Sequence, residues 1–153
     1  MPFTEANFEN AILEIFRDLL GYEYLYGPDV VRDFAEPLCP EILEDALVRI
    51  NPSLPRAAID EAIARIRTHE SGSLARKNAR FTDMLQNGVA VNYFDGSEQR
   101  AGLVRLVDYD LPMRNRFTVA NQWTVEERSV RRADIVVFVN GLPLVVVELK
   151  SPS

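Results

Sequence analysis

Several residue types that build common functional sites are scarce in this sequence of 153 residues. One cysteine, Cys39, and one histidine, His69, exclude an internal disulfide framework and leave no cluster of ligands for zinc. No segment approaches the roughly 18 consecutive apolar residues of a membrane-spanning helix. No G-x-x-x-x-G-K-[ST] loop for nucleotide phosphates occurs. We therefore expect a cytoplasmic protein that has no contact with a membrane.

Basic residues are outnumbered, and they are unevenly distributed. The net charge is −6, but residues 1–98 carry 9 basic and 17 acidic residues, whereas residues 99–153 carry 8 and 6. A polyanion would be expected at the second part, although a solvated surface explains the same excess. Lysine is rare: Lys77 and Lys150 are the only two among 17 basic residues.

Apolar spacing predicts a helix near residues 4–20, capped by Thr4, and three more helices within residues 40–88. From Val89 the pattern is that of strands, in "VAVNYF", "GLVRLVDYD", "FTVANQWTVEE", "ADIVVFV" and "LPLVVVELK". We expect one α/β domain over residues 1–153: a first helix in 1–22, a helical insertion in 40–88, and a central mixed sheet in 89–153. The last two strands are apolar on both faces, which predicts a central position.

Three charged residues lie within this apolar hairpin, "RRADIVVFVNGLPLVVVELKSPS". Burying such groups costs several kcal/mol each unless they are paired or bind a metal. Asp134 and Glu148 could hold a Mg²⁺ ion, with the backbone carbonyl of Leu149 as a third ligand. Lys150, on the same strand face as Glu148, could orient an attacking water. The other interpretation is that Glu148 and Lys150 mark where the strand meets solvent.

The loop of the hairpin decides whether the two carboxylates meet. A two-residue turn at Asn140-Gly141 would set Asp134 opposite Val147, and Glu148 would point the other way. A three-residue loop that includes Leu142 would set Asp134 opposite Glu148. The proposed chemistry therefore predicts the three-residue loop.

The sequence resembles the N-terminal nuclease domain of the restriction (R) subunit of type I restriction-modification enzymes. "RRADIVVFVNGLPLVVVELKSP" carries the resemblance above all, with "NARFTDMLQNGVAVNY", "VRLVDYDLPMRNRFTVANQW" and "ANFENAILEIFRDLLGYEYLYG". The resemblance implies a restriction-endonuclease-like PD-(D/E)xK core that cleaves duplex DNA in an ATP-dependent holoenzyme. It implies Asp134 and Glu148 as metal ligands and Lys150 as the catalytic lysine. A first-helix glutamate often joins such a site, which points to Glu9 or to Glu5; solvated glutamates favoured by the helix dipole are the alternative.

The resemblance also implies partners, which are duplex DNA and the methyltransferase and specificity subunits, and Mg²⁺ as cofactor. ATP would serve only motor domains outside this chain. Ala133 stands where the family often has proline, a difference that affects only the entry into the strand. The Gln-x-x-x-Tyr element that follows Lys150 in the family is absent. We therefore expect this chain to be the N-terminal part of a longer protein. Two alternatives are a docking module for partner subunits and a stand-alone repair or junction nuclease.

Arginines could contact DNA phosphates near the hairpin. Arg131 and Arg132 precede Asp134, and Arg114 and Arg116 form a second group. For Arg114 and Arg116, a solvated surface explains their positions at least as well. Trp123 could stack on bases, but an aromatic residue on an alternating strand is more often in the core.

Overall fold

The computed structural model describes residues 4–68 and 71–150, and the chain divides into two compact units. Unit 1 is discontinuous and consists of Met1–Pro40 and Arg116–Ser153. Unit 2 is the continuous segment Glu41–Asn115. The sequence predicts a single domain with a helical insertion in 40–88, whereas the inserted unit extends to Asn115 and contains strands as well as helices.

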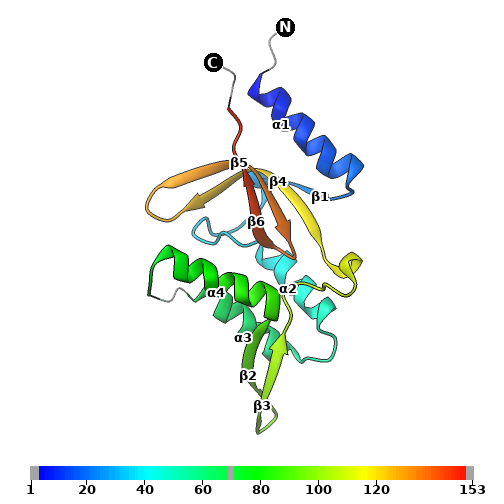
Figure 1. The fold of residues 1–153 in the computed structure, drawn as a ribbon, viewed down its shortest axis with the longest axis vertical. Helices are drawn as coiled ribbons and strands as arrows, with labels where there is room; N and C mark the ends of the chain where they lie inside the picture. The colour runs from blue at the N-terminus through cyan, green and yellow to red at the C-terminus, as the bar shows by residue number, and fades with distance from the viewer. Residues whose placement is uncertain (1–3, 69–70, 151–153) are drawn as a thin grey trace. The chain divides into compact units, whose positions relative to one another are not determined.

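Unit 1 is an α/β structure with a four-stranded sheet (Figure 1). The strand order is β1-β4-β5-β6, in which β1 runs parallel to β4 and the other neighbours are antiparallel. The sheet is therefore mixed, as the sequence predicts. Its strands are β1 (Glu23–Tyr26), β4 (Phe117–Glu126), β5 (Val130–Val139) and β6 (Leu142–Val147).

The first helix, α1 (Glu5–Glu14), begins where the sequence predicts. The Thr4 hydroxyl accepts a bond from the Asn7 backbone N–H, and the Asn7 side chain accepts one from the Thr4 N–H. A π-helical segment, η1 (Ile15–Leu19), continues the helix, and the 3-10 turn η2 (Gly27–Asp29) follows β1. The apolar side of α1 packs on one face of the sheet through a core of Leu13, Val119, Ile135 and Val137.

Trp123 belongs to the core of unit 1. Its side chain is buried, and its ring meets Phe138 edge-on with 4.9 Å between centroids. The guanidinium of Arg32 lies 3.7 Å from the Trp123 ring centroid, a cation–π contact. The core interpretation of this aromatic residue is confirmed, and its ring is not free to stack on a base.

The position of β6 differs from the prediction. β5 is central, as expected, but β6 is an edge strand of the sheet that the described residues form. Leu144, Val145 and Val146 are 40%, 48% and 58% exposed. A run of β-branched residues indicates an extended segment, but it does not tell whether a second layer covers that segment.

Unit 2 contains three helices and a sheet of its own (Figure 1). In the part of the chain that the structure describes, the strands that begin at Val89 and Glu98 pair only with each other, so the predicted single sheet of residues 89–153 is instead divided between two sheets. The reason is local, because Asp95-Gly96-Ser97 closes a hairpin with Gly96 at φ +65°. The elements are α2 (Pro40–Ile50), α3 (Arg56–Arg67), α4 (Leu74–Asn87), β2 (Val89–Asp95), β3 (Glu98–Val104) and a 3-10 turn η3 (Pro112–Arg114).

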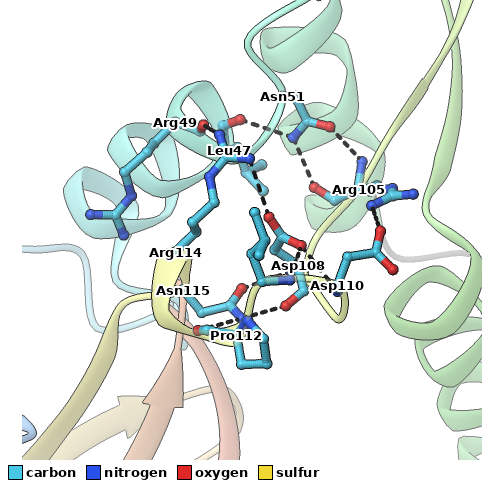
Figure 2. Close-up of polar contacts among 10 residues, drawn as sticks. Leu47, Arg49, Asn51, Arg105, Asp108, Asp110, Pro112, Arg114 and Asn115 are labelled. Atoms are coloured by element: carbon cyan, nitrogen blue, oxygen red, sulfur yellow. Dashed lines mark hydrogen bonds and ion pairs between the residues drawn. The ribbon is translucent and has the colours of Figure 1, made fainter.

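Buried amides fix the segment that closes unit 2, as Figure 2 shows. Asn51 accepts a bond from the Arg105 N–H and donates one to the Arg105 carbonyl, both 2.9 Å long. The Asp108 carboxylate accepts bonds from the Asp110 and Leu111 N–H groups. These bonds bend the chain after Val104, which is why the predicted strand "GLVRLVDYD" ends there.

No helix within the described ranges is long and apolar enough to cross a membrane.

Candidate active site

The β5–β6 turn is a two-residue loop, so the prediction of a three-residue loop is wrong. Asn140 and Gly141 have φ angles of 52° and 77°, and Val139 pairs with Leu142 directly across them. Positive φ at both central residues is the requirement of a type I′ turn, which Asn-Gly satisfies at low cost. The buried Asn140 side chain also accepts a 2.7 Å bond from the Arg116 N–H. Local turn chemistry therefore sets the loop length.

A β-bulge in β6 nevertheless shifts the pairing of β5 with β6 by one residue, the same shift that a three-residue loop would produce. Phe138 pairs with Pro143, but Val137 pairs with Val145, so Leu144 is an extra residue on β6. Beyond the bulge the ladder ends at Ile135 opposite Val147. The same register, continued by one residue past the end of β6, would set Asp134 opposite Glu148.

A hydrogen bond confirms that the chain after β6 still runs beside Asp134. The Leu149 backbone N–H donates to Oδ2 of Asp134 at 2.7 Å. The Asp134 side chain is half-buried, while the side chains of Glu148 and Lys150 are exposed. The structure thus brings the segment 148–150 to Asp134, and the Leu149 amide, predicted to act through its carbonyl, fixes the carboxylate through its N–H.

On the other side of β5, the β4 ladder is interrupted at the same level. Asn121 pairs with Ile135 and Trp123 pairs with Ala133, which leaves Gln122 opposite Asp134 without ladder pairing. Gln122 has a φ of 54°, in the left-handed region that residues other than glycine seldom adopt. The backbone of Gly27 approaches the Gln122 backbone so closely that only glycine fits there, because a Cβ on Gly27 would lie 2.5 Å from the Gln122 carbonyl oxygen.

This backbone irregularity brings two consecutive amides to Glu9 on α1. The Asn121 side chain donates to Oε1 of Glu9 at 2.6 Å, and Gln122 Nε2 donates to its Oε1 and Oε2 at 3.2 and 3.0 Å. In a regular strand, neighbouring side chains point to opposite faces, so the left-handed residue is what allows both contacts. Trp123, the next residue, then reaches Phe138.

Tyr24 of β1 completes the polar cluster around Glu9. Its hydroxyl donates to Oδ1 of Asn121 at 2.8 Å, which orients the amide nitrogen of Asn121 toward Glu9. Burial, and to a smaller extent the nearby charge of Glu9, raise the pKa of Tyr24 above its ordinary value. The hydroxyl therefore keeps its proton, and hence its role as donor, throughout the neutral pH range.

The Glu9 carboxylate is held by the side-chain amides of Asn121 and Gln122. Among the described residues, no three His, Cys, Asp or Glu side chains are grouped so that they could hold a metal ion. What the hairpin offers is the carboxylate of Asp134 with the segment 148–150 beside it. Glu9, the predicted catalytic glutamate, is instead held by Asn121 and Gln122. Glu5 lies one helical turn earlier on α1 and is exposed.

Residues 2–153 match the sequence profile of the family described as "Type I restriction enzyme R protein N terminus". The chain belongs to this family. It is 38% identical over 159 aligned residues to "Type I restriction enzyme HindI endonuclease subunit" of Haemophilus influenzae, an alignment that covers 97% of this chain and 15% of that protein. It is 30% identical over 157 residues to "Putative type I restriction enzyme MjaIXP endonuclease subunit" of Methanocaldococcus jannaschii, covering 94% and 15%. The chain thus spans about 15% of the length of these curated relatives.

The arginines predicted to bind DNA differ in their surroundings in this member of the R protein family. Arg131 and Arg132 are exposed on β5, three and two residues before Asp134. Arg116 forms a bidentate pair with Glu23, with both bonds 2.8 Å long. Arg114, in unit 2, donates to the Arg49 carbonyl at 2.9 Å and lies 3.5 Å from the buried Asp108 carboxylate. Arg114 and Arg116 therefore have structural contacts, and phosphate contact remains a prediction for all four.

Sequence reasoning missed the polar residues that hold Glu9, namely Tyr24, Asn121 and Gln122. A usable signal existed, because Asn121 and Gln122 are adjacent amides in the middle of the otherwise apolar stretch "FTVANQWTV". A buried amide is costly unless it is hydrogen-bonded, so the pair indicated a polar partner across the fold. Nothing in the spacing identified that partner as Glu9, which lies more than a hundred residues earlier.

Proposed function

We propose that this chain is the metal-dependent endonuclease domain of a type I restriction R subunit and that it hydrolyses phosphodiester bonds of duplex DNA. The observation that carries the proposal is the Leu149 N–H bond to Asp134, which sets the Glu148–Lys150 segment beside that carboxylate. Membership of the R protein family supports the restriction role. ATP hydrolysis and the contacts with methyltransferase and specificity subunits would belong to a holoenzyme of which this chain is one part.

The donor set suits a hard divalent cation such as Mg²⁺. Such ions take oxygen ligands, and in proteins they use one or two carboxylates and keep several waters. Asp134 and Glu148 would supply the carboxylates, and the Leu149 carbonyl a further oxygen. When bound, the ion would neutralise charge that develops on the phosphate. The Leu149 N–H occupies one lone pair of Asp134 Oδ2 and thereby limits the rotation of this carboxylate.

Lys150 would orient the attacking water. Its ammonium group is a compact charge with rotatable donors, which can orient a water and balance the negative charge of the scissile phosphate. An arginine would present a rigid fork that resists deprotonation, so lysine suits a group that exchanges a proton with water. The exposure of Lys150 leaves it accessible to a strand of DNA.

Three single variants of a full-length subunit that contains this chain test the proposal. Asp134→Asn, Glu148→Gln and Lys150→Ala should each lower DNA cleavage in the assembled complex by at least about 100-fold. ATP hydrolysis should stay at the wild-type rate, because these residues would not contribute to it. Glu127→Gln, at an exposed carboxylate in the β4–β5 turn, is the matched control and should cleave normally. Wild-type cleavage by any of the three variants would remove that residue from the site.

A further inference from the structure

The region around the end of α3 and the beginning of α4 concentrates positive charge. Residues 65–80 contain five basic residues and one acidic residue, a net charge of +4 within a chain of net charge −6. The rest of the chain therefore carries a net charge of −10. A local concentration this far from the average creates an attractive field for an anion on an otherwise repulsive molecule.

Four of these cations line one pocket between α3 and α4. Arg65 comes from α3, and Arg76, Lys77 and Arg80 come from α4, while Phe81 and Met84 form part of its apolar lining. The pocket has a volume of about 140 Å³. Drug-sized ligands and cofactors occupy pockets of roughly 300–1,000 Å³, so this space suits a small group such as a phosphate.

Two of the cations are anchored and two are available. Arg65 pairs with Glu61 at 2.9 Å and donates to the Ala90 carbonyl at 2.7 Å. Arg80 lies 3.5 Å from the Thr68 carbonyl. Arg76 and Lys77, by contrast, are exposed at the beginning of α4. The anchored arginines form a fixed positive wall, and the exposed pair can move to meet a ligand.

The placement of Arg76 and Lys77 works against helix stability. The N-terminal turn of a helix favours acidic residues because of the helix dipole, and cations there are unfavourable. The first turn of α4 contains no acidic residue, and Ser73 alone caps it by accepting from the Arg76 N–H. An anion bound at this end would interact favourably with both the helix dipole and the two cations. It would thereby offset the unfavourable interaction between the dipole and these cations.

We propose that this pocket, defined by Arg65, Arg76, Lys77 and Arg80, binds a backbone phosphate of duplex DNA. The inference rests on the proposed nuclease function, which makes duplex DNA the polyanion that this chain meets. Phosphate contacts supply most non-specific affinity for DNA, and a chain of net charge −6 needs a local cationic surface to make them. The contact involves other residues than Asp134, Glu148 and Lys150 and does not read the DNA sequence.

Salt-dependent binding tests the pocket. The double variant Arg76→Gln/Lys77→Gln of the 153-residue chain would be compared with the wild type by fluorescence anisotropy, using a labelled duplex in EDTA at 50–200 mM KCl. Each lost phosphate contact lowers the slope of log affinity against log salt by about 0.9, so we expect a decrease of about 1–2. Affinity at the lowest salt concentration should fall at least about 10-fold. Thermal unfolding checks that the fold is retained.

The control has the same change of net charge on the same unit. Arg49→Gln/Arg100→Gln removes two exposed arginines outside the pocket and should leave the salt slope unchanged. Equal effects of the two double variants would overturn the proposal, because they would reflect net charge alone. An unchanged slope in Arg76→Gln/Lys77→Gln would overturn it as well.

The test separates this inference from the proposed function. Binding is measured in EDTA, where no metal-dependent cleavage occurs, and cleavage is measured with Mg²⁺. Lys150→Ala should fail to cleave DNA with Mg²⁺ in the assembled enzyme, whatever its affinity for the duplex in EDTA. A pocket variant that binds normally overturns the pocket alone, and a Lys150→Ala variant that cleaves overturns the nuclease assignment alone.

Discussion

At the scale of single residues, the strained backbone of Gln122 is offset by the hydrogen bonds that it allows to Glu9. A left-handed φ at a residue other than glycine costs of order 1 kcal/mol. Here it allows Asn121 and Gln122 to donate three hydrogen bonds to one carboxylate, and bonds to a charged group contribute about 1.5–3 kcal/mol each. The balance favours the strained backbone. It also fixes Glu9 on α1 next to the strand position that faces Asp134.

A charge swap tests this arrangement. Gln122→Glu would replace a donor by a second carboxylate against Glu9, and we expect the free energy of unfolding to fall by about 1–3 kcal/mol. Adding Glu9→Gln should restore much of that loss, because the amide and the carboxylate have then exchanged places. Urea denaturation measures both, with Gln99→Glu on the exposed part of β3 as control. Independent, additive losses in the double variant would show that the two side chains do not interact.

At the scale of elements, the hairpin shows what its sequence could and could not predict. Asn140-Gly141 predicts a tight turn, and the alternation of β5 predicts a strand with a buried face. The bulge at Leu144 was not predicted, although Pro143 stands beside it, and proline, which lacks an N–H, is found in sheets mainly on edge strands and at bulges. The prediction of a three-residue loop was therefore wrong, because the extra residue lies in the strand and not in the loop. The facing of Asp134 and Glu148 stays a prediction.

The same limit applies to the other elements. Helices α2, α3 and α4 follow from apolar spacing and from Gly88, at φ +84° after α4, because these signals are local. The pairing of β2 with β3 is local as well, because a tight turn at Gly96 joins the two strands. The exposed edge of β6, by contrast, depends on partners distant in sequence. Of the site, the hairpin residues could be found by their chemistry, whereas the residues that hold Glu9 could not be assigned to it.

A register exchange tests the bulge. Deleting Leu144 should restore a regular ladder from the two-residue turn, so that Asp134 faces Val147 and cleavage falls at least about 100-fold. Inserting a glycine after Gly141 into that deletion variant creates a three-residue loop and should return Asp134 to Glu148, with recovery of cleavage. Plasmid cleavage by the assembled enzyme and circular dichroism are the measurements. Leu144→Ala, which keeps the residue count, should retain activity, and a fully active deletion variant would show that the offset is unimportant.

At the scale of the whole molecule, unit 2 is inserted into unit 1 at one place. The Cys39 N–H donates to the Gly141 carbonyl at 2.9 Å, and the Asn140 N–H donates to the Arg116 carbonyl at 2.8 Å. The chain therefore leaves unit 1 and returns to it at two consecutive residues of the hairpin turn. The two hydrogen bonds thus attach the ends of the inserted segment to the β5–β6 turn. Asp134 and the segment 148–150 lie toward the opposite end of the hairpin.

This arrangement predicts that unit 1 folds without the insertion. Replacing residues 41–115 by about four Gly and Ser residues, which span up to about 13 Å, joins Pro40 to Arg116 across neighbouring positions of the turn. Unit 1 retains its own core of α1 against the sheet, so we expect a cooperative thermal transition and a circular dichroism spectrum that keeps its strand signal. The shortened chain should also lose the part of its salt-dependent DNA affinity that Arg76 and Lys77 supply, as the double variant does. An aggregated product without a cooperative transition would show that the sheet of unit 1 depends on residues 41–115 for its burial.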